Sequence, residues 1–323
     1  MDSEMPTITN KANGYSEYSF HSVAHFFKWH STFNYRWSSP ISGMVFRGHS
    51  LSSYELIPSA HRMDSQTNRP KILNYVSNPY TFPAHLSEYN LVEAEYETLL
   101  SFFRLANEQG LYVPDCDLLS EDYLSSIFYK SIDKLSTWFN PSFIRLAALA
   151  QHYGIPTRML DWSFEFESAL YFALEGIVEA KNTGANIAKQ FAIWGVNAKS
   201  LMSVYDIAQR CPLRFIVPNY FNNSNIIGQK GLLSYVEVND ITNKRQTPFD
   251  TKPFDLIITD YLSSFNIKND GLVLCKMVFP TENAVEELNT LQNKGTSAAT
   301  IYPSYSGIAK KLTLDHIIRR LSE

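Results

Sequence analysis

The sequence predicts an α+β fold, in which residues 15–323 form a single domain with a mixed or antiparallel sheet at its core. A helical insertion is expected at about residues 86–140. Short apolar runs that suit strands are spread along the chain, and most of them follow residue 190. Segments with helical spacing of apolar residues lie between these runs, and no internal repeat is present. This distribution does not favour a doubly wound parallel sheet.

The first half of the chain has a mainly helical pattern. Residues 1–14 are polar, and we expect them to form a flexible N-terminal arm. A short buried strand is expected at residues 44–46, followed by an extended stretch at 54–58 and a proline-interrupted loop at 64–83. Helices are expected at residues 16–37, 86–106, 121–139 and 141–151. The last of these should stop at Gly154, because glycine accepts a left-handed turn.

The second half of the chain contains most of the expected strands. A helix is predicted at residues 168–180 and precedes them. The strand candidates are residues 191–196, 215–217, 232–238 and 272–279. Two further helices are predicted near the end of the chain, at residues 282–292 and 308–321.

Composition and charge narrow the classes of function. Hydrophobic residues make up 45% and charged residues 19% of the chain, which is typical of a folded protein. The formal net charge of −4 and the scattered Lys and Arg residues argue against general affinity for nucleic acid, although a local basic groove stays open. The three cysteines lie far apart and suit a reducing compartment. With no signal-peptide pattern and no membrane-spanning run, a cytoplasmic location is expected.

The first candidate site motif is Phe46-Arg47-Gly48-His49, which is followed by Arg62. A guanidinium at the end of a buried strand suits an anionic group, because its planar fork matches carboxylate or phosphate. Gly48 would let a ligand approach the backbone. The alternative is a buried Arg47 that pairs with an internal carboxylate.

The second motif is the dense polar and aromatic stretch of residues 151–162, between two predicted helices. Functional residues concentrate in such connecting segments. We expect Asp161 to orient a cationic neighbour, Arg158 or Arg62. The site candidates in this stretch are His152, Tyr153, Thr157, Arg158, Asp161 and Trp162, and we expect them to share one cleft with Arg47. The alternative is an architectural loop in which Asp161 caps the next helix or pairs with Arg158.

The third motif, Asn225 to Leu233, places Gly228, Gln229, Lys230 and Gly231 before a predicted strand. It suits a turn that closes a pocket, and the alternative is an ordinary tight turn.

Taken in order, these motifs resemble those of the FRG-domain family. The matching segments are Phe46-Arg47-Gly48, His152-Tyr153-Gly154, Pro156-Thr157-Arg158, Leu160-Asp161-Trp162, Gln229-Lys230-Gly231 and residues 302–309. The resemblance covers about residues 40–312. The chain departs from the family pattern at His49, where Gln is frequent, at Ile227, near where Arg is frequent, and at Ser304 and Ser306, where Asp is frequent. The family is often encoded near bacterial toxin or phage-defence genes, so the resemblance implies such a setting.

The order of the motifs is also similar to that of ADP-ribosyltransferases, which implies a related fold and NAD as a co-substrate. The implied catalytic residues are Arg47, Tyr171, and Gln229 or Glu237. In that reading, Arg47 binds the pyrophosphate, an aromatic ring stacks on nicotinamide, and a late carboxylate steadies the oxocarbenium-like ribose. The implied cofactor-binding residues are Arg47, Gly48, Arg62, His152, Tyr153, Thr157, Arg158, Asp161 and Trp162.

Another class of function stays open, a non-catalytic module that senses a nucleotide, a nucleic-acid end or a protein partner such as an antitoxin. The absence of an evident nucleophile, paired carboxylates or metal ligands favours this reading, and no metal is expected. A ribonuclease that uses His152 with Arg158 is a further alternative.

Overall fold

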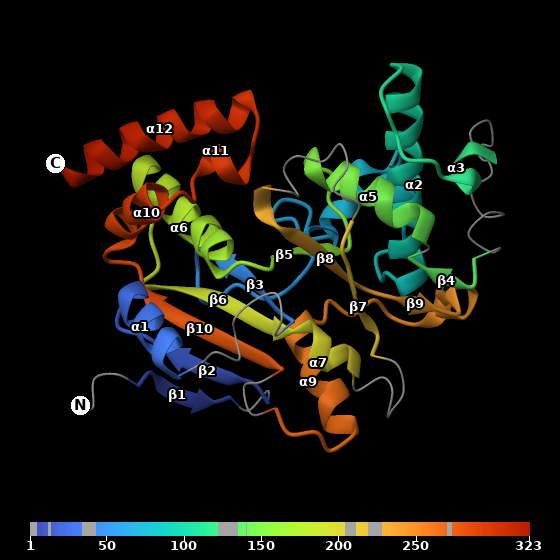
Figure 1. Ribbon diagram of the computed structural model, residues 1–323. Helices are drawn as coiled ribbons and strands as arrows, with labels where there is room; N and C mark the ends of the chain where they lie inside the picture. Colours follow the sequence, from blue (N-terminus) through green and yellow to red (C-terminus); the bar gives the residue numbers. More distant parts are fainter. Residues whose placement is uncertain are drawn as a thin grey trace.

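The computed structural model describes residues 5–11, 14–33, 43–121, 135–139, 141–203, 211–218, 228–269 and 273–323. Its centre is an eight-stranded sheet in the order β1-β2-β10-β6-β3-β5-β8-β7 (Figure 1). Neighbouring strands are antiparallel except for the parallel pair β2 and β10. Together with the helices, this mixed sheet confirms the predicted α+β class.

The strands of the large sheet come from both halves of the chain. They are β1 (Thr7–Asn10), β2 (Ser16–Ser19), β3 (Met44–His49), β5 (Met159–Ser163), β6 (Gln190–Asn197), β7 (Leu213–Ile216), β8 (Gly231–Val236) and β10 (Leu274–Pro280). A separate two-stranded sheet contains β4 (Thr137–Trp138) and β9 (Val238–Asn239).

Ten α-helices lie within the described part of the chain. They are α1 (Val23–Phe33), α2 (Glu88–Glu108), α3 (Asp117–Glu121), α5 (Pro141–His152), α6 (Phe166–Thr183), α7 (Ala198–Ser203), α9 (Phe254–Ser264), α10 (Ala284–Asn293), α11 (Ala298–Ile301) and α12 (Tyr305–Ser322). Short 3-10 turns occupy η2 (Ser59–His61), η3 (Lys71–Tyr75), η4 (Pro79–Thr81) and η6 (Ile241–Gln246). Within the residues described, no helix is both long enough and apolar enough to cross a membrane.

Several predicted elements differ from the structure. Residues 7–10 of the expected N-terminal arm form β1, and residues 16–19, expected at the start of a helix, form β2. The segment 159–163, expected as a loop, is strand β5. Residues 122–134 of the helix expected at 121–139 lie outside the described residues, and residues 137–138 form β4. In β5 a polar residue interrupts four buried ones, so its short sequence shows no clear strand alternation.

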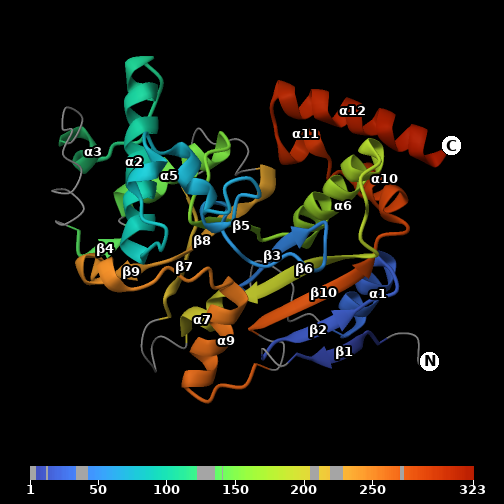
Figure 2. The same cartoon turned by 180° about the vertical axis from the view of Figure 1, so that it is seen from behind.

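The helices cover the sheet in separate groups (Figures 1 and 2). Helices α6, α10 and α12 pack with β3, β6 and β10 in one apolar core. Helices α2 and α5 pack with β5 and β8 in a second core. Strand β5 alternates between cores, because Met159 belongs to the second core whereas Leu160 and Trp162 belong to a third with α9.

The junction between β3 and β5 is the part of the sheet that positions the site. These strands pair only at Phe46 and Ser163, whereas β3 pairs with β6 from Met44 to His49. Helix α6 lies very close to β3 here, because a Cβ on Gly48 would lie 1.9 Å from the Ala169 carbonyl oxygen. The short pairing leaves room beside β3 that side chains of both helix groups can reach.

Candidate functional site

A cavity of about 530 Å³ lies beside the junction of β3 and β5. Its walls come from β3, α5, β5, α6, β8 with the segment before it, and the start of α12 with the segment between α11 and α12. The lining residues are Phe46, Arg47, Gly48, Ala148, Gln151, His152, Asp161, Trp162, Ser163, Ala169, Phe172, Gln229, Leu233, Tyr302 and Ser306. Thus residues from four distant parts of the sequence share one concave site.

Arg47 is held in the cavity wall by two internal acceptors. Its Nε donates a hydrogen bond to His49 Nε2 at 3.2 Å, and its Nη1 donates to the Asp161 carbonyl at 2.7 Å. The side chain is 18% exposed. Burial lowers the pKa of Arg47 to about 10, although Asp161 raises it and Arg62 lowers it further. Arg47 therefore remains a cation at neutral pH.

The Asp161 carboxyl is the acidic group of the cavity wall. Its Oδ1 accepts a hydrogen bond of 2.6 Å from Gln151 Nε2, and its Oδ2 lies 3.9 Å from Arg47 Nη1. The carboxyl is 55% exposed, yet desolvation raises its pKa, against the lowering effects of Arg47 and Gln151. Its ion-pair partner is Arg47, which corrects the expected partner Arg158 or Arg62. Because β5 runs beside β3, Asp161 reaches the arginine of the neighbouring strand.

Two aromatic side chains of the cavity come from α6 and the C-terminal segment. Phe172 and Tyr302 meet edge to face, with ring centroids 6.1 Å apart. Tyr171, the predicted stacking residue, is fully buried and its hydroxyl donates to Glu175 Oε1 at 2.5 Å. Successive residues on a helix are rotated by about 100°, so Phe172 rather than Tyr171 faces the cavity. The placement predicted for Tyr171 is thereby corrected.

His152 and Trp162 line the cavity as predicted, whereas Tyr153 does not belong to its lining. The indole of Trp162 is almost completely buried and its Nε1 donates to Ser234 Oγ at 2.7 Å. Tyr153 is 70% exposed and packs edge-on against the His152 ring at 5.0 Å. Trp162 therefore forms a rigid wall, and Tyr153 lies on the outer surface.

Of the two late residues predicted as catalytic, only Gln229 lines the cavity. The segment that holds Gln229 is tied to β5, because Ser163 Oγ donates to the Gln229 carbonyl at 2.8 Å. Glu237 follows β8 and accepts a hydrogen bond of 2.8 Å from Arg214 Nη2. Its predicted place in the site is corrected, since the strand carries it away from Gln229.

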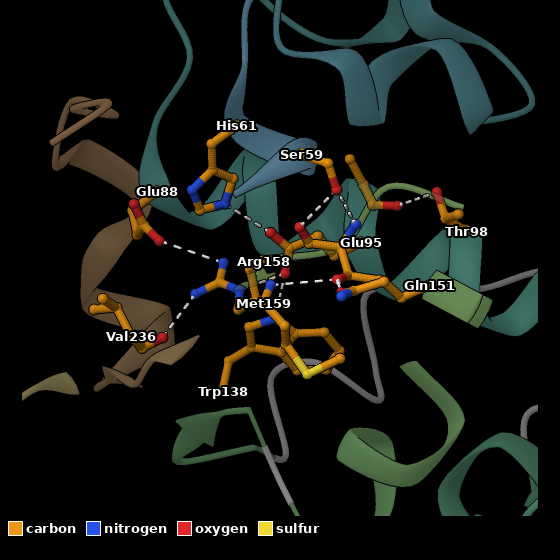
Figure 3. A network of polar contacts seen from close by, with 12 residues as sticks. Ser59, His61, Glu88, Glu95, Thr98, Trp138, Gln151, Arg158, Met159 and Val236 are labelled. Carbon is orange, nitrogen blue, oxygen red and sulfur yellow. Dashed lines mark hydrogen bonds and ion pairs between the residues drawn. The ribbon is translucent and has the colours of Figure 1, made fainter. Parts of the chain in front are cut away.

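Arg158 is buried in a separate polar network (Figure 3). Its Nε donates to Glu95 Oε2 at 2.5 Å, its Nη2 lies 3.4 Å from Glu88 Oε1, and its Nη1 donates to the Val236 carbonyl at 3.3 Å. Only 2% of its side chain is exposed, so it cannot meet a ligand in the cavity. Its predicted role at the ligand is corrected to an internal tie between α2 and the start of β5.

Glu95 is the centre of this network. Its Oε2 also accepts from Trp138 Nε1 at 2.6 Å, and its Oε1 accepts from His61 Nε2 at 3.0 Å. Burial raises the pKa of Glu95, but Arg158 and His61 outweigh that effect and lower it to about 2. The folded state therefore favours an ionised Glu95.

Of the other predicted binding residues, Arg62 and Thr157 lie around the cavity rather than in its lining. Arg62 donates from Nε to the Ile57 carbonyl at 2.9 Å. Thr157 is buried and its hydroxyl donates to Gln151 Oε1. Gly48 does line the cavity. However, a glycine is required here because a Cβ would clash with the backbone of α6, and not because a ligand must approach.

Nine lining residues were absent from the predicted site, namely Phe46, Ala148, Gln151, Ser163, Ala169, Phe172, Leu233, Tyr302 and Ser306. Gln151 precedes the predicted His152, and Phe172 follows the predicted Tyr171. Tyr302 and Ser306 lie in the C-terminal segment that carried the family resemblance, which was the signal for including it. In the described part of the chain, no group of three or more His, Cys, Asp or Glu residues is placed to hold a metal ion.

A known protein domain matches the part of the chain that forms much of this cavity. The FRG domain matches residues 42–182, which include Arg47, Gln151, Asp161 and Phe172. No curated protein and no solved structure matches the chain. Gln229, Tyr302 and Ser306 lie beyond the matched residues and complete the cavity from outside them. The chain therefore carries an FRG domain at residues 42–182, as its motifs predicted for that region.

Proposed function

We propose that the cavity binds a nucleotide-like ligand through a phosphate group, with NAD and ADP-ribose as representatives of this class. The observation that carries the proposal is Arg47, a cation held by internal hydrogen bonds in the wall of a cavity of about 530 Å³. Ligand pockets have volumes of about 300–1,000 Å³, so the space suits a molecule of this size.

Arg47 retains donors for an anion. Its two hydrogen bonds to described residues use one N–H of Nε and one of Nη1, and no described residue accepts from Nη2. A guanidinium edge with free N–H groups can bind two phosphate oxygens at once. Phe172 and Tyr302 provide apolar ring surface in the same cavity for a base or a nicotinamide ring.

A second candidate function is cleavage of NAD, which Asp161 favours because it places a carboxylate beside Arg47 in the cavity. In such a reaction the N-glycosidic bond breaks and its electron pair leaves with nicotinamide. Water, or the nucleophile of an acceptor, then adds to the ribose C1′ and loses a proton. A nearby carboxylate would stabilise the positive charge that develops on the ribose. In this proposal Asp161 takes the role first given to Gln229 or Glu237.

The biological setting of this activity is part of the proposal. An NAD-consuming FRG protein would act as an effector of a toxin or phage-defence system and would be restrained by a protein partner. Growth of bacteria that express the wild type or Arg47→Lys would test this. The setting predicts that only the wild type slows growth, and equal growth of both strains would contradict it.

The binding proposal is tested by isothermal titration calorimetry with NAD and ADP-ribose. Arg47→Lys should weaken binding about ten- to a hundredfold, because lysine keeps the charge but loses the planar two-pronged contact. The matched control is Arg319→Lys, since Arg319 lies exposed on α12 and its hydrogen bond within the described residues goes to the Asp315 carbonyl. The control should bind as the wild type does.

Two results would contradict the binding proposal. Unchanged affinity in Arg47→Lys would remove Arg47 from the site, and unfolding of this variant would show that Arg47 is a structural partner. A measurement of nicotinamide release from NAD separates the two candidate functions. If the wild type binds NAD but releases no nicotinamide, the cavity binds the ligand without cleaving it. If turnover occurs, Asp161→Asn should lower its rate much more than it lowers NAD affinity.

A further inference from the structure

We propose that His49 and Thr157 are positioning residues, which hold Arg47 and Asp161 in their binding orientations from outside the cavity. The inference rests on the proposed ligand site and adds residues that do not line it. His49 and Thr157 are 6% and 4% exposed, and neither belongs to the cavity lining.

His49 orients the guanidinium of Arg47. Its Nε2 lies 3.2 Å from Arg47 Nε, and its Nδ1 lies 3.2 Å from the Tyr54 carbonyl oxygen. Arg47 Nε can only donate and the Tyr54 carbonyl can only accept. The ring must therefore be neutral, with its proton on Nδ1 and a lone pair on Nε2 for Arg47.

The surroundings of His49 keep the ring in this neutral form. Burial is the largest cause that lowers the pKa of His49 to about 3, and Arg47 lowers it further. Arg62 and Lys276 act in the same direction, whereas the hydrogen bond with Tyr54 raises the pKa. A protonated ring would lose its lone pair for Arg47 and place a second cation against the guanidinium.

Thr157 orients the amide of Gln151, which in turn orients Asp161. The Thr157 hydroxyl donates to Gln151 Oε1, while it accepts from the Met159 backbone N–H at 3.3 Å. With Oε1 held in this way, Gln151 Nε2 faces Asp161 and donates to Oδ1 at 2.6 Å. The flipped amide would place an oxygen against the carboxylate and a donor against the hydroxyl.

These contacts form one chain of polar groups around the cavity wall. It runs from the Tyr54 carbonyl through His49 to Arg47, whose Nη1 donates to the Asp161 carbonyl. It continues from the Asp161 carboxyl through Gln151 to Thr157 (Gln151 is labelled in Figure 3). The two charges of the site are thus ordered before a ligand arrives. Losing the order of one such side chain should weaken binding by up to about tenfold.

The test of His49 needs no ligand. Long-range proton–nitrogen NMR of histidine-labelled protein should show His49 with a protonated Nδ1 and a bare Nε2 at pH 7, and unchanged at pH 5. The His49→Gln spectrum assigns its signals among the eight histidines of the chain. A proton on Nε2, or titration near the ordinary histidine pKa of 6.5, would overturn the assignment.

The test of Thr157 also has a ligand-free readout, the pKa of the Asp161 carboxyl followed by carbon NMR. The hydrogen bond from Gln151 lowers this pKa. Thr157→Val keeps the shape of the side chain but removes the hydroxyl that holds Gln151, so the pKa of Asp161 should rise. Thr157→Ser should leave it unchanged, and equal pKa values in the Val variant and the wild type would refute the role of Thr157.

Calorimetry with ADP-ribose then measures the effect of positioning on binding. His49→Leu and Thr157→Val should each weaken binding up to about tenfold. His49→Gln and Thr157→Ser should restore affinity to within about threefold, because an amide can accept from Arg47 and donate to Tyr54, and serine keeps the hydroxyl. Equal losses in the conservative and apolar variants would reduce both residues to packing roles. If the wild type binds no ADP-ribose, the ligand proposal fails, while the NMR results still decide the orientations of His49 and Gln151.

Discussion

Replacing Glu95 by Gln should cost the protein much of the stability of its buried Arg158 network. The substitution keeps the size of the side chain but removes the charge that faces Arg158 and His61. The glutamine oxygen could still accept one hydrogen bond, but among the described residues Arg158 would keep only Glu88, at 3.4 Å, as a charged partner. With 2% of its side chain exposed, the guanidinium cannot turn to water for compensation.

The expected magnitude follows from the burial of this pair. Removing one partner of a buried ion pair lowers the free energy of unfolding by about 3–5 kcal/mol. Unfolding entropy is about 2.1 cal/mol/K per residue, which is about 0.7 kcal/mol/K for 323 residues. Glu95→Gln should therefore lower the melting temperature by about 4–7 °C.

Differential scanning calorimetry at pH 7 measures this change. Glu108→Gln is the matched control, because Glu108 lies on the same helix α2 and is exposed. The control should change the free energy of unfolding by less than about 0.5 kcal/mol. A loss below about 1 kcal/mol in Glu95→Gln would show that the buried network does not stabilise the fold as the geometry indicates.

The Glu95→Gln variant also tests how the stability contributed by Glu95 changes with pH. The pKa of Glu95 is lowered from 4.5 to about 2 in the folded protein, so ionised Glu95 stabilises the folded state. This contribution is complete above about pH 4.5 and is lost as the pH falls toward 2. The stability difference between wild type and Glu95→Gln should therefore shrink through this range. A difference that stays constant from pH 5 to pH 2 would contradict the lowered pKa.

Two further substitutions test the placement of site residues. Gly48→Ala should lower the free energy of unfolding, measured by chemical denaturation, by about 1–3 kcal/mol or more. The reason is that the added Cβ would lie 1.9 Å from the Ala169 carbonyl oxygen. An Ala variant as stable as the wild type would show that α6 can move away from β3. Glu237→Gln should leave binding of ADP-ribose unchanged, while it weakens the pair with Arg214 by about 1.5–3 kcal/mol. A variant that loses ADP-ribose binding but keeps its stability would show that Glu237 belongs to the ligand site.

The motifs around Arg47 and residues 151–162 could be recognised without the structure, and five of their predicted residues do share the cavity. These are Arg47, Gly48, His152, Asp161 and Trp162. Their segments are short, polar and bounded by apolar elements, which is a local property that a sequence displays. The α+β class could be predicted for a similar reason, because strand and helix periodicities are also local.

The different roles of Arg47, in the cavity wall, and Arg158, in a buried ion pair, could not be predicted from the sequence. Arg47 and Arg158 both lie in motifs that look equally suited to an anion. Arg158 donates to the carboxylate of Glu95, a residue 63 positions earlier. Arg47 instead donates to a histidine ring and a backbone carbonyl, and its remaining N–H groups can donate to a ligand in the cavity. Which carboxylate reaches which cation depends on helix and strand packing, which local composition does not encode.

The family resemblance, the fold class and the segments that hold the site could be predicted from residue types and their spacing. Which side chains of those segments face the cavity depends on tertiary contacts. Tyr171 and Phe172 are neighbours of similar chemistry, yet one helical step buries the first and presents the second. Tyr302 joins Phe172 only because the C-terminal segment returns to α6. The physical reason is that residue type and spacing set local conformation, whereas burial and partner choice arise from contacts between distant parts of the chain.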